Sequence, residues 1–154
     1  MRNLYKYVII LFICFSLSCK KDTATKEIAF AKEAEVNIYT RDGQEYTFAV
    51  EIAQTEYERV RGLMYRYRLE QNQGMFFIFD SMAPQSFWMK NTYISLDMLF
   101  IDEEMNIVYI HENAFPLSEE AIHCEVPVRY VLEILGGISK KFNIVIGDKV
   151  SLVR

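Results

Sequence analysis

The chain has 154 residues and a mass of 18.1 kDa, which is the size of one domain. Hydrophobic residues make up 51% and charged residues 25%, so disordered, collagen-like and low-complexity classes are excluded for most of its length. The net charge of -4 lacks the basic footprint of a nucleic-acid-binding protein, and we expect no nucleic-acid partner.

Residues 1–18 have the pattern of a secretory signal. Arg2 and Lys6 precede an apolar run over about residues 7–17, shorter than the roughly 20 residues that span a bilayer. The small residue Ser18 stands directly before Cys19. This order resembles the lipobox of bacterial lipoproteins, which implies lipidation of Cys19 and cleavage before it. An uncleaved anchor helix and a cleaved soluble signal are the alternatives.

A lipid on Cys19 predicts a lipid-anchored, extracytoplasmic protein of the cell envelope, on the periplasmic or surface side of a bacterial membrane. The membrane is then its first partner, since several acyl chains give stable anchoring.

Removal of the signal also changes the composition of the chain. It takes away two of the 17 basic residues, which leaves 15 against 21 acidic residues and a net charge of -6. Cys14 leaves too, so Cys124 has no partner for an intramolecular disulfide. Residues 19–34 are polar and are expected to form a flexible tether with a reach of roughly 20 Å, with a short helix as the alternative.

Residues 35–154 are expected to fold as a single β domain. The Asp42-Gly43 pair predicts a hairpin turn between the first two strands. The run Gly74–Phe79 is apolar at every position after the glycine, so it predicts a strand covered on both faces. Alternation and clustering predict strands at Val36–Thr40, Glu45–Ala53, Gly74–Phe79, Ser86–Ile94, Met98–Ile101, Ile107–His111, Arg129–Leu135 and Lys149–Val153.

Two short helices are expected between these strands. Thr55 and Glu58 have the spacing of a capping box, and Gly62 is suited to end that helix. The second helix is expected at Ser139–Phe142, closed by Asn143, which tolerates the left-handed conformation. Many short strands separated by turns predict a mainly β fold: a compact antiparallel β-sandwich or barrel-like domain with two short helices.

Several sequence blocks occur in the order typical of one family. They are Arg61–Arg66 (RGLMYR), Gly74–Phe77 (GMFF), Phe87–Thr92 (FWMKNT), Leu96–Phe100 (LDMLF), Val131–Glu133 (VLE) and Ile146–Asp148 (IGD). The chain resembles the domain of unknown function 192 family over about residues 36–153. The resemblance implies a compact, mainly antiparallel β domain and no settled activity. Ser95 and Asn143 depart from the family pattern, where proline and glycine are usual.

Six residues are candidates for a ligand cleft. They are Arg61, Trp88, Lys90, Asn91, Asp97 and Glu133. Trp88 offers a stacking face, and the charged groups would orient a small polar ligand. The structural alternative places Trp88 in the core and an Arg61 bridge to Asp97 or Glu133, because charges among apolar residues need partners.

The function that the sequence favours most is a non-catalytic binding or interaction module with a small-molecule or protein partner. One alternative is a small envelope enzyme that uses Asp97, Glu133 or Lys90 for acid–base work. The other is a metal-binding protein that uses His123, Cys124 and the scattered methionines. Adjacent strand residues point to opposite faces, and methionine is a common core filler, so neither a metal nor any other cofactor is expected.

Overall fold

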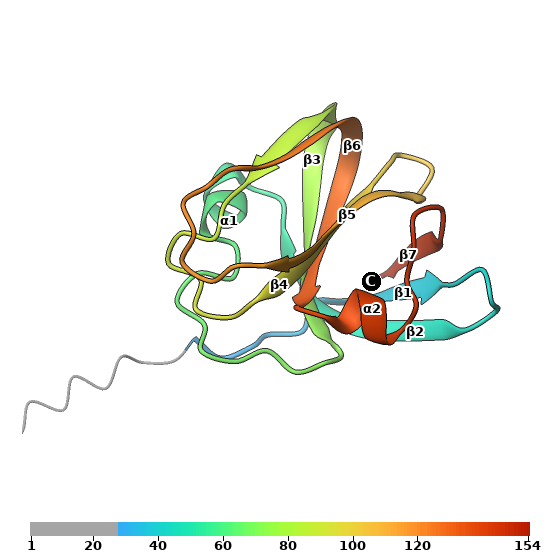
Figure 1. Ribbon diagram of the computed structural model, residues 1–154, viewed down its shortest axis with the longest axis horizontal. Coiled ribbons are helices and arrows are strands. Elements are labelled where there is room, and N and C mark those ends of the chain that lie inside the picture. The colour runs from blue at the N-terminus through green and yellow to red at the C-terminus, as the bar shows by residue number, and fades with distance from the viewer. Residues whose placement is uncertain (1–27) are drawn as a thin grey trace, which may run out of the picture.

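The computed structural model describes residues 28–154. The predicted signal, Cys19 and most of the predicted tether lie outside the described residues. The described elements are, in chain order, β1 (Ala34–Tyr39), β2 (Glu45–Ala53), α1 (Glu56–Arg61), β3 (Gln73–Phe87), β4 (Leu96–Ile101), β5 (Ile107–Ala114), β6 (Ile122–Leu135), α2 (Ile138–Lys141) and β7 (Lys149–Val153) (Figure 1).

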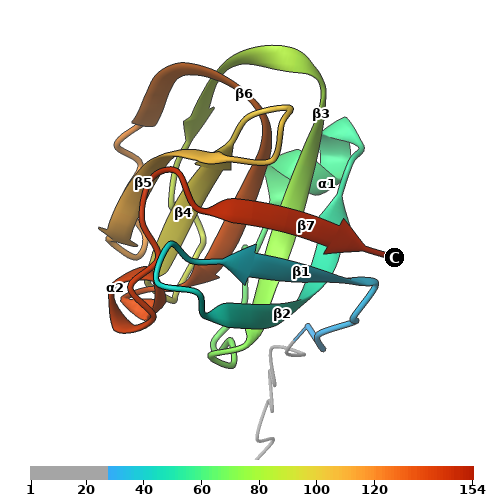
Figure 2. The ribbon, with the colours of Figure 1, turned by 90° about the vertical axis from the view of Figure 1, so that its right-hand side faces the viewer.

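The strands form a single curled sheet in the order β5-β4-β6-β3-β2-β1-β7 (Figures 1 and 2). Its two ends approach each other, because Asn106, next to β5, pairs with Lys149 at the start of β7. Backbone bonds from Ile107 N to Asp148 O (3.0 Å) and from Val150 N to Met105 O (2.8 Å) hold this closure. The expected mainly β, barrel-like architecture with two short helices is confirmed.

Strands β2 and β3 are the parallel neighbours in this otherwise antiparallel sheet. Parallel strands need a crossover connection rather than a tight turn. Helix α1 and the following loop provide that connection between Ala53 and Gln73. Helix α1 is thereby held against the sheet beside the central strands.

The predicted strand Ser86–Ile94 is wrong beyond Phe87. The structure instead extends β3 to Phe87 and starts β6 at Ile122, so the two strands pair well past the central sheet. Residues 80–86 are mostly polar or small, which concealed this extension from a search for apolar runs. Register shifts between Ile78 and Gln85 mark bulges that bend the long ribbon.

The two faces of the sheet pack against two separate cores. One core holds the β1, β2 and β7 side chains with Leu132 and Ile134 of β6. The other holds Val131 of β6 with Phe77 and Phe100 of the neighbouring strands. Because side chains alternate along a strand, Glu133 shares its face with Val131, on the side of the second core.

The ends of both helices carry the capping residues that the sequence predicted. The capping box of α1 is formed by Thr55 and Glu58, and Gly62 closes the helix with a φ of 45°. Asn143 follows α2 with a φ of 54°. No helix in residues 28–154 is long and apolar enough to cross a membrane.

Candidate functional site

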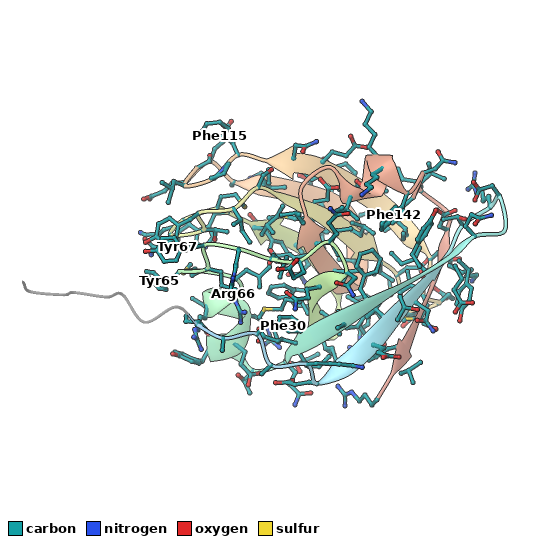
Figure 3. The ribbon with its side chains drawn as sticks, turned by 90° about the horizontal axis from the view of Figure 1, so that it is seen from below. Phe30, Tyr65, Arg66, Tyr67, Phe115 and Phe142 are labelled. Carbon is teal, nitrogen blue, oxygen red and sulfur yellow. The ribbon has the colours of Figure 1, made fainter. Side chains whose placement is uncertain are left out.

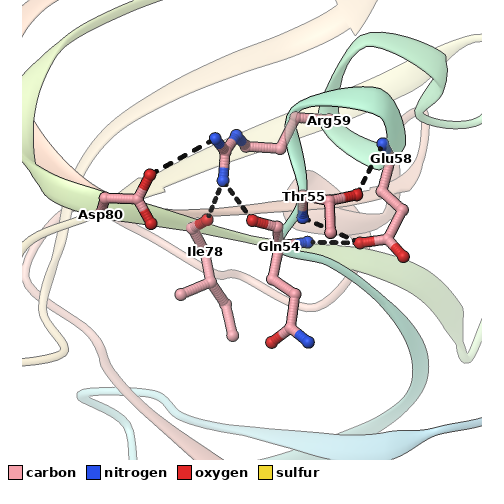
Figure 4. A network of polar contacts seen from close by, with 6 residues as sticks. All are labelled: Gln54, Thr55, Glu58, Arg59, Ile78 and Asp80. Atoms are coloured by element: carbon pink, nitrogen blue, oxygen red, sulfur yellow. Dashed lines mark hydrogen bonds and ion pairs between the residues drawn. The ribbon is translucent and has the colours of Figure 1, made fainter.

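Helix α1 is fixed to the sheet by its cap and by one arginine (Figure 4). The Glu58 carboxylate accepts from the backbone N–H groups of Thr55 (2.9 Å) and Gln54 (3.0 Å). The Arg59 guanidinium donates to the Ile78 carbonyl of β3 (3.0 Å) and to the Gln54 carbonyl (2.5 Å). These contacts hold a helix that has no buried residue of its own against β3.

A pocket of about 390 Å³ lies beneath α1, bounded by β3, β6 and the segment before β6. Its apolar lining includes Leu63, Phe77 and Phe87. The Phe87 ring meets Phe77 edge-on, with the centroids 5.3 Å apart. The volume lies in the range of small-molecule sites, and the lining combines apolar with polar side chains.

Glu133 is the buried carboxyl of this lining, which also includes polar side chains such as Gln85, Ser86 and Thr92. Its side chain is 4% exposed and lines the pocket, and its neighbours across the sheet are Met75 and Met98. It makes no hydrogen bond or ion pair with any other residue in 28–154. Burial raises the pKa of its carboxyl from 4.5 to about 8. At neutral pH Glu133 is therefore mostly protonated, and its O–H is a donor that faces the pocket.

Arg61 and Trp88 line the same pocket nearer to solvent. The Arg61 side chain is exposed, and within the described residues it forms none of the expected bridges to Asp97 or Glu133. Trp88 is 44% exposed, so it is a pocket wall and not a core residue. The Lys90 ammonium lies 5.2 Å from the centre of the Trp88 ring and 3.7 Å from the Glu119 carboxylate. Lys90 does not line the pocket itself, but it contacts two residues that do.

Asn91 and Asp97 do not reach this pocket. Asn91 has a φ of 56° and donates through its amide to the Tyr65 hydroxyl (3.0 Å). Asp97 is fully buried on the opposite face of the sheet and accepts from backbone N–H groups of Asn113, Gly137 and Ser139. The structure thus brings together Arg61, Trp88 and Glu133, with Lys90 beside them, while Asp97 has a structural role.

The residues named for acid–base catalysis are separated by the sheet. Asp97 and Glu133 occupy opposite faces, because Glu133 pairs with Met98, one position along β4 from Asp97. Glu133 remains as the one buried carboxyl of that set in the pocket. It has no second carboxylate from the set with which to share a proton.

The residues named for a metal site are also separated. His123 is exposed, whereas Cys124 is buried and donates its thiol to the Val126 carbonyl (3.4 Å). Burial raises the pKa of the Cys124 thiol, which keeps it protonated. In the described part of the chain, no three His, Cys, Asp or Glu residues are grouped as metal ligands. Met75, Met89 and Met98 are buried in the second core.

The sequence alone missed the apolar part of the pocket. Leu63, Phe77 and Phe87 each belong to one of the sequence blocks that resemble the family. The neighbouring residues in the sequence do not indicate that these three side chains line the same pocket. The signal that existed was the apolar run Gly74–Phe79, which predicted a central strand. The rest required the long pairing of β3 with β6.

The comparisons with known proteins agree with this fold. The model of DUF192, described as Uncharacterized ACR, COG1430, matches residues 37–152. The crystal structure of a candidate transcription regulator from Sinorhizobium meliloti 1021 is similar, with 41% identity and a TM-score of 0.77, covering 82% of this chain and 97% of that one. A protein of unknown function from Novosphingobium aromaticivorans DSM 12444 has 33% identity and a TM-score of 0.75, covering 84% and 96%. No curated protein matches. The chain belongs to the DUF192 family of uncharacterised proteins.

Proposed function

We propose that this domain is a binding module that holds a small amphipathic molecule in the pocket beneath α1. The observation that carries the proposal is the Glu133 carboxyl, which is buried in the pocket lining without a partner in residues 28–154. The carboxyl oxygens of Glu133 are not sealed from solvent, because no fully buried side-chain oxygen in residues 28–154 lacks a hydrogen-bond partner. A ligand that presents an acceptor in the pocket would give Glu133 the hydrogen bond that the described residues do not supply.

The two ends of the pocket favour different parts of such a ligand. Phe77, Phe87 and Leu63 suit an apolar body. At the solvent side, Arg61 offers a permanent positive charge whose guanidinium is not used by other described residues. The lining also includes the carboxylates of Glu56 and Glu119, and Glu119 is paired with Lys90. We therefore expect a molecule with an apolar body and an acidic or otherwise hydrogen-bond-accepting head, and we expect organic cations to bind less well.

A titration with three eight-carbon probes tests this ligand class. Trp88 lines the pocket and is the only tryptophan of the chain, so its fluorescence reports binding directly. Octanoate should bind most tightly, octanol next and octylammonium least. Tighter binding of octylammonium would overturn the choice of an acceptor, and no response to any probe would overturn the pocket as a binding site.

Two variants locate the binding. Arg61→Gln should weaken octanoate about tenfold, the effect of one charge-assisted hydrogen bond, and should leave octanol unchanged. Lys140→Gln on α2 is the matched control, since Lys140 is an exposed cation outside the pocket. Ala121→Trp should block all three probes from the exposed rim, as measured by calorimetry because it adds a second tryptophan. Equal octanoate affinity in Arg61→Gln and Lys140→Gln would contradict the role of Arg61.

We propose further that the domain works in the cell envelope, anchored to a membrane through lipid on Cys19. The support is the signal-like pattern of residues 1–18 with Ser18 before Cys19. Growing cells fed a clickable fatty acid should label the parent protein and Cys14→Ala, but not Cys19→Ala. Label that persists in Cys19→Ala would overturn the anchor without touching the pocket.

A further inference from the structure

Exposed aromatic and aliphatic side chains gather on one side of the domain. We call them the aromatic patch: Tyr65, Tyr67, Tyr93, Phe115 and Leu117. Figure 3 shows Tyr65, Tyr67 and Phe115 on the same side of the molecule, and Phe115 is 79% exposed. The patch comes from three loops that are separate in sequence.

Direct contacts make these loops one surface. The rings of Tyr67 and Tyr93 stack with their centroids 4.8 Å apart. The Tyr65 N–H donates to the Asn91 carbonyl (2.8 Å), and the Leu117 N–H donates to the Thr92 carbonyl (3.0 Å). A contiguous apolar surface built from several loops is the type that marks an interaction site, unlike singly scattered exposed hydrophobic residues.

The start of the described chain packs beside this patch. The Phe30 ring lies 5.9 Å from the Arg66 guanidinium, and Arg66 stands between Tyr65 and Tyr67 in the sequence (Figure 3). The Ala31 N–H donates to the Glu51 carboxylate (2.7 Å), which is also the ion-pair partner of Arg66. The chain therefore enters the domain at a fixed place, next to the loop that carries the two tyrosines.

The length of chain before that place limits how the domain can lie. Nine residue steps separate Cys19 from Ile28. Fully extended they reach about 30 Å, and as a coil about 15–18 Å. An anchor at Cys19 would thus hold the domain close to the bilayer by the side on which the aromatic patch lies.

We infer that the aromatic patch rests in the interface of the bilayer to which Cys19 is anchored. This inference depends on the proposed anchor and goes beyond it by fixing the orientation of the domain. Tyrosine prefers the headgroup region, where its ring is apolar and its hydroxyl stays hydrated. The predicted charge of the processed chain is -6, so the contact is apolar rather than electrostatic and anionic lipids are not required.

Quenching by brominated lipids tests this orientation. The processed lipoprotein is reconstituted into phosphatidylcholine vesicles with lipids brominated on their acyl chains. A Trp88→Phe background removes the native fluorophore, and Phe115→Trp then reports from the patch. The control is Ile146→Trp, because Ile146 is 52% exposed and its carbonyl is bound by Arg41 of the β1–β2 turn, far from the patch (Figure 1).

The Phe115→Trp reporter should lose at least half of its fluorescence, and the Ile146→Trp reporter should be unaffected. The quenching should persist in 1 M NaCl. Absent or equal quenching of the two reporters, or its loss in salt, would overturn the inference. A nitroxide on Phe115→Cys with Trp88 intact gives an independent depth from collisions with oxygen, in case the Trp88→Phe background folds poorly. Fatty-acid labelling of the same preparation shows separately whether the anchor is present.

Discussion

Asp97 and Ser139 lie 42 positions apart in sequence, yet one carboxylate oxygen of Asp97 accepts both the N–H (2.9 Å) and the hydroxyl (2.5 Å) of Ser139. The other carboxylate oxygen accepts the N–H groups of Asn113 (2.8 Å) and Gly137 (2.9 Å). Asp97 thereby joins β4, β5 and the start of α2 in one buried network.

Asp97→Ala should therefore be strongly destabilising, because it leaves three backbone N–H groups without their acceptor. We expect the free energy of unfolding to fall by about 3–5 kcal/mol, as when a buried charged partner is removed. Ser139→Ala removes one donor and should cost about 1 kcal/mol. Urea midpoints measure both, and equal midpoints for the two variants would contradict the network.

Glu133 predicts a specific dependence of stability on pH. Its pKa is about 8 in the folded protein against 4.5 normally, so between these values the folded state holds a proton that the unfolded state has released. This contribution is favourable below pH 4.5 and is lost as the pH rises towards 8, by about 1.4 kcal/mol per unit.

Glu133→Gln isolates that effect, because the amide has nearly the same shape and does not titrate. The free energy of unfolding of the variant, relative to the parent, should rise steadily from pH 5 to pH 8. Urea unfolding at each pH measures the difference. A difference that stays constant over this range would show that Glu133 is already ionised in the folded protein.

The ion pair between Arg66 and Glu51 is expected to stabilise the fold at the place where the chain enters the domain. Both side chains are buried, at 7% and 8% exposed, so removing one leaves the other without compensation. Arg66→Met should cost about 3–5 kcal/mol, and Glu51→Met/Arg66→Met should recover part of it. Lys32→Met in the exposed Lys32–Glu35 pair should cost less than about 1 kcal/mol. Denaturant midpoints that are equal for Arg66→Met and Lys32→Met would contradict the burial of the pair.

Gly74 should not accept a side chain. A Cβ at this position would lie 2.5 Å from the backbone carbonyl oxygen of Glu133, and that backbone is held by the pairing of β3 with β6. Gly74→Ala should cost about 3 kcal/mol, the upper end of the range for overpacking. Gly43→Ala at the open β1–β2 turn meets no atom within 4 Å and should cost about 1 kcal/mol through its φ of 83°. Thermal unfolding compares the two, and a smaller loss at Gly74 would show that β3 can move away from β6.

Several local features could be read directly from the sequence. The hairpin at Asp42-Gly43, the capping box of Thr55 and Glu58, and the left-handed Asn143 depend on neighbouring residues only. Strands with a continuous apolar run, such as the one from Gly74, were also found. In each case the chemistry that determines the structure lies within a few positions.

The candidate site needed the tertiary structure, because it depends on register and on which strands are neighbours. Asp97 and Glu133 look alike in sequence, each an acid between apolar residues. The pairing of β4 with β6 puts them on opposite faces, one among backbone donors and the other in the pocket. The period-two alternation of a strand makes such a difference all-or-none, since a shift of one residue moves a side chain to the other face. The sequence by itself therefore determined the fold class and its turns, and the long-range pairing decided which carboxyl is held by backbone donors and which lines the pocket.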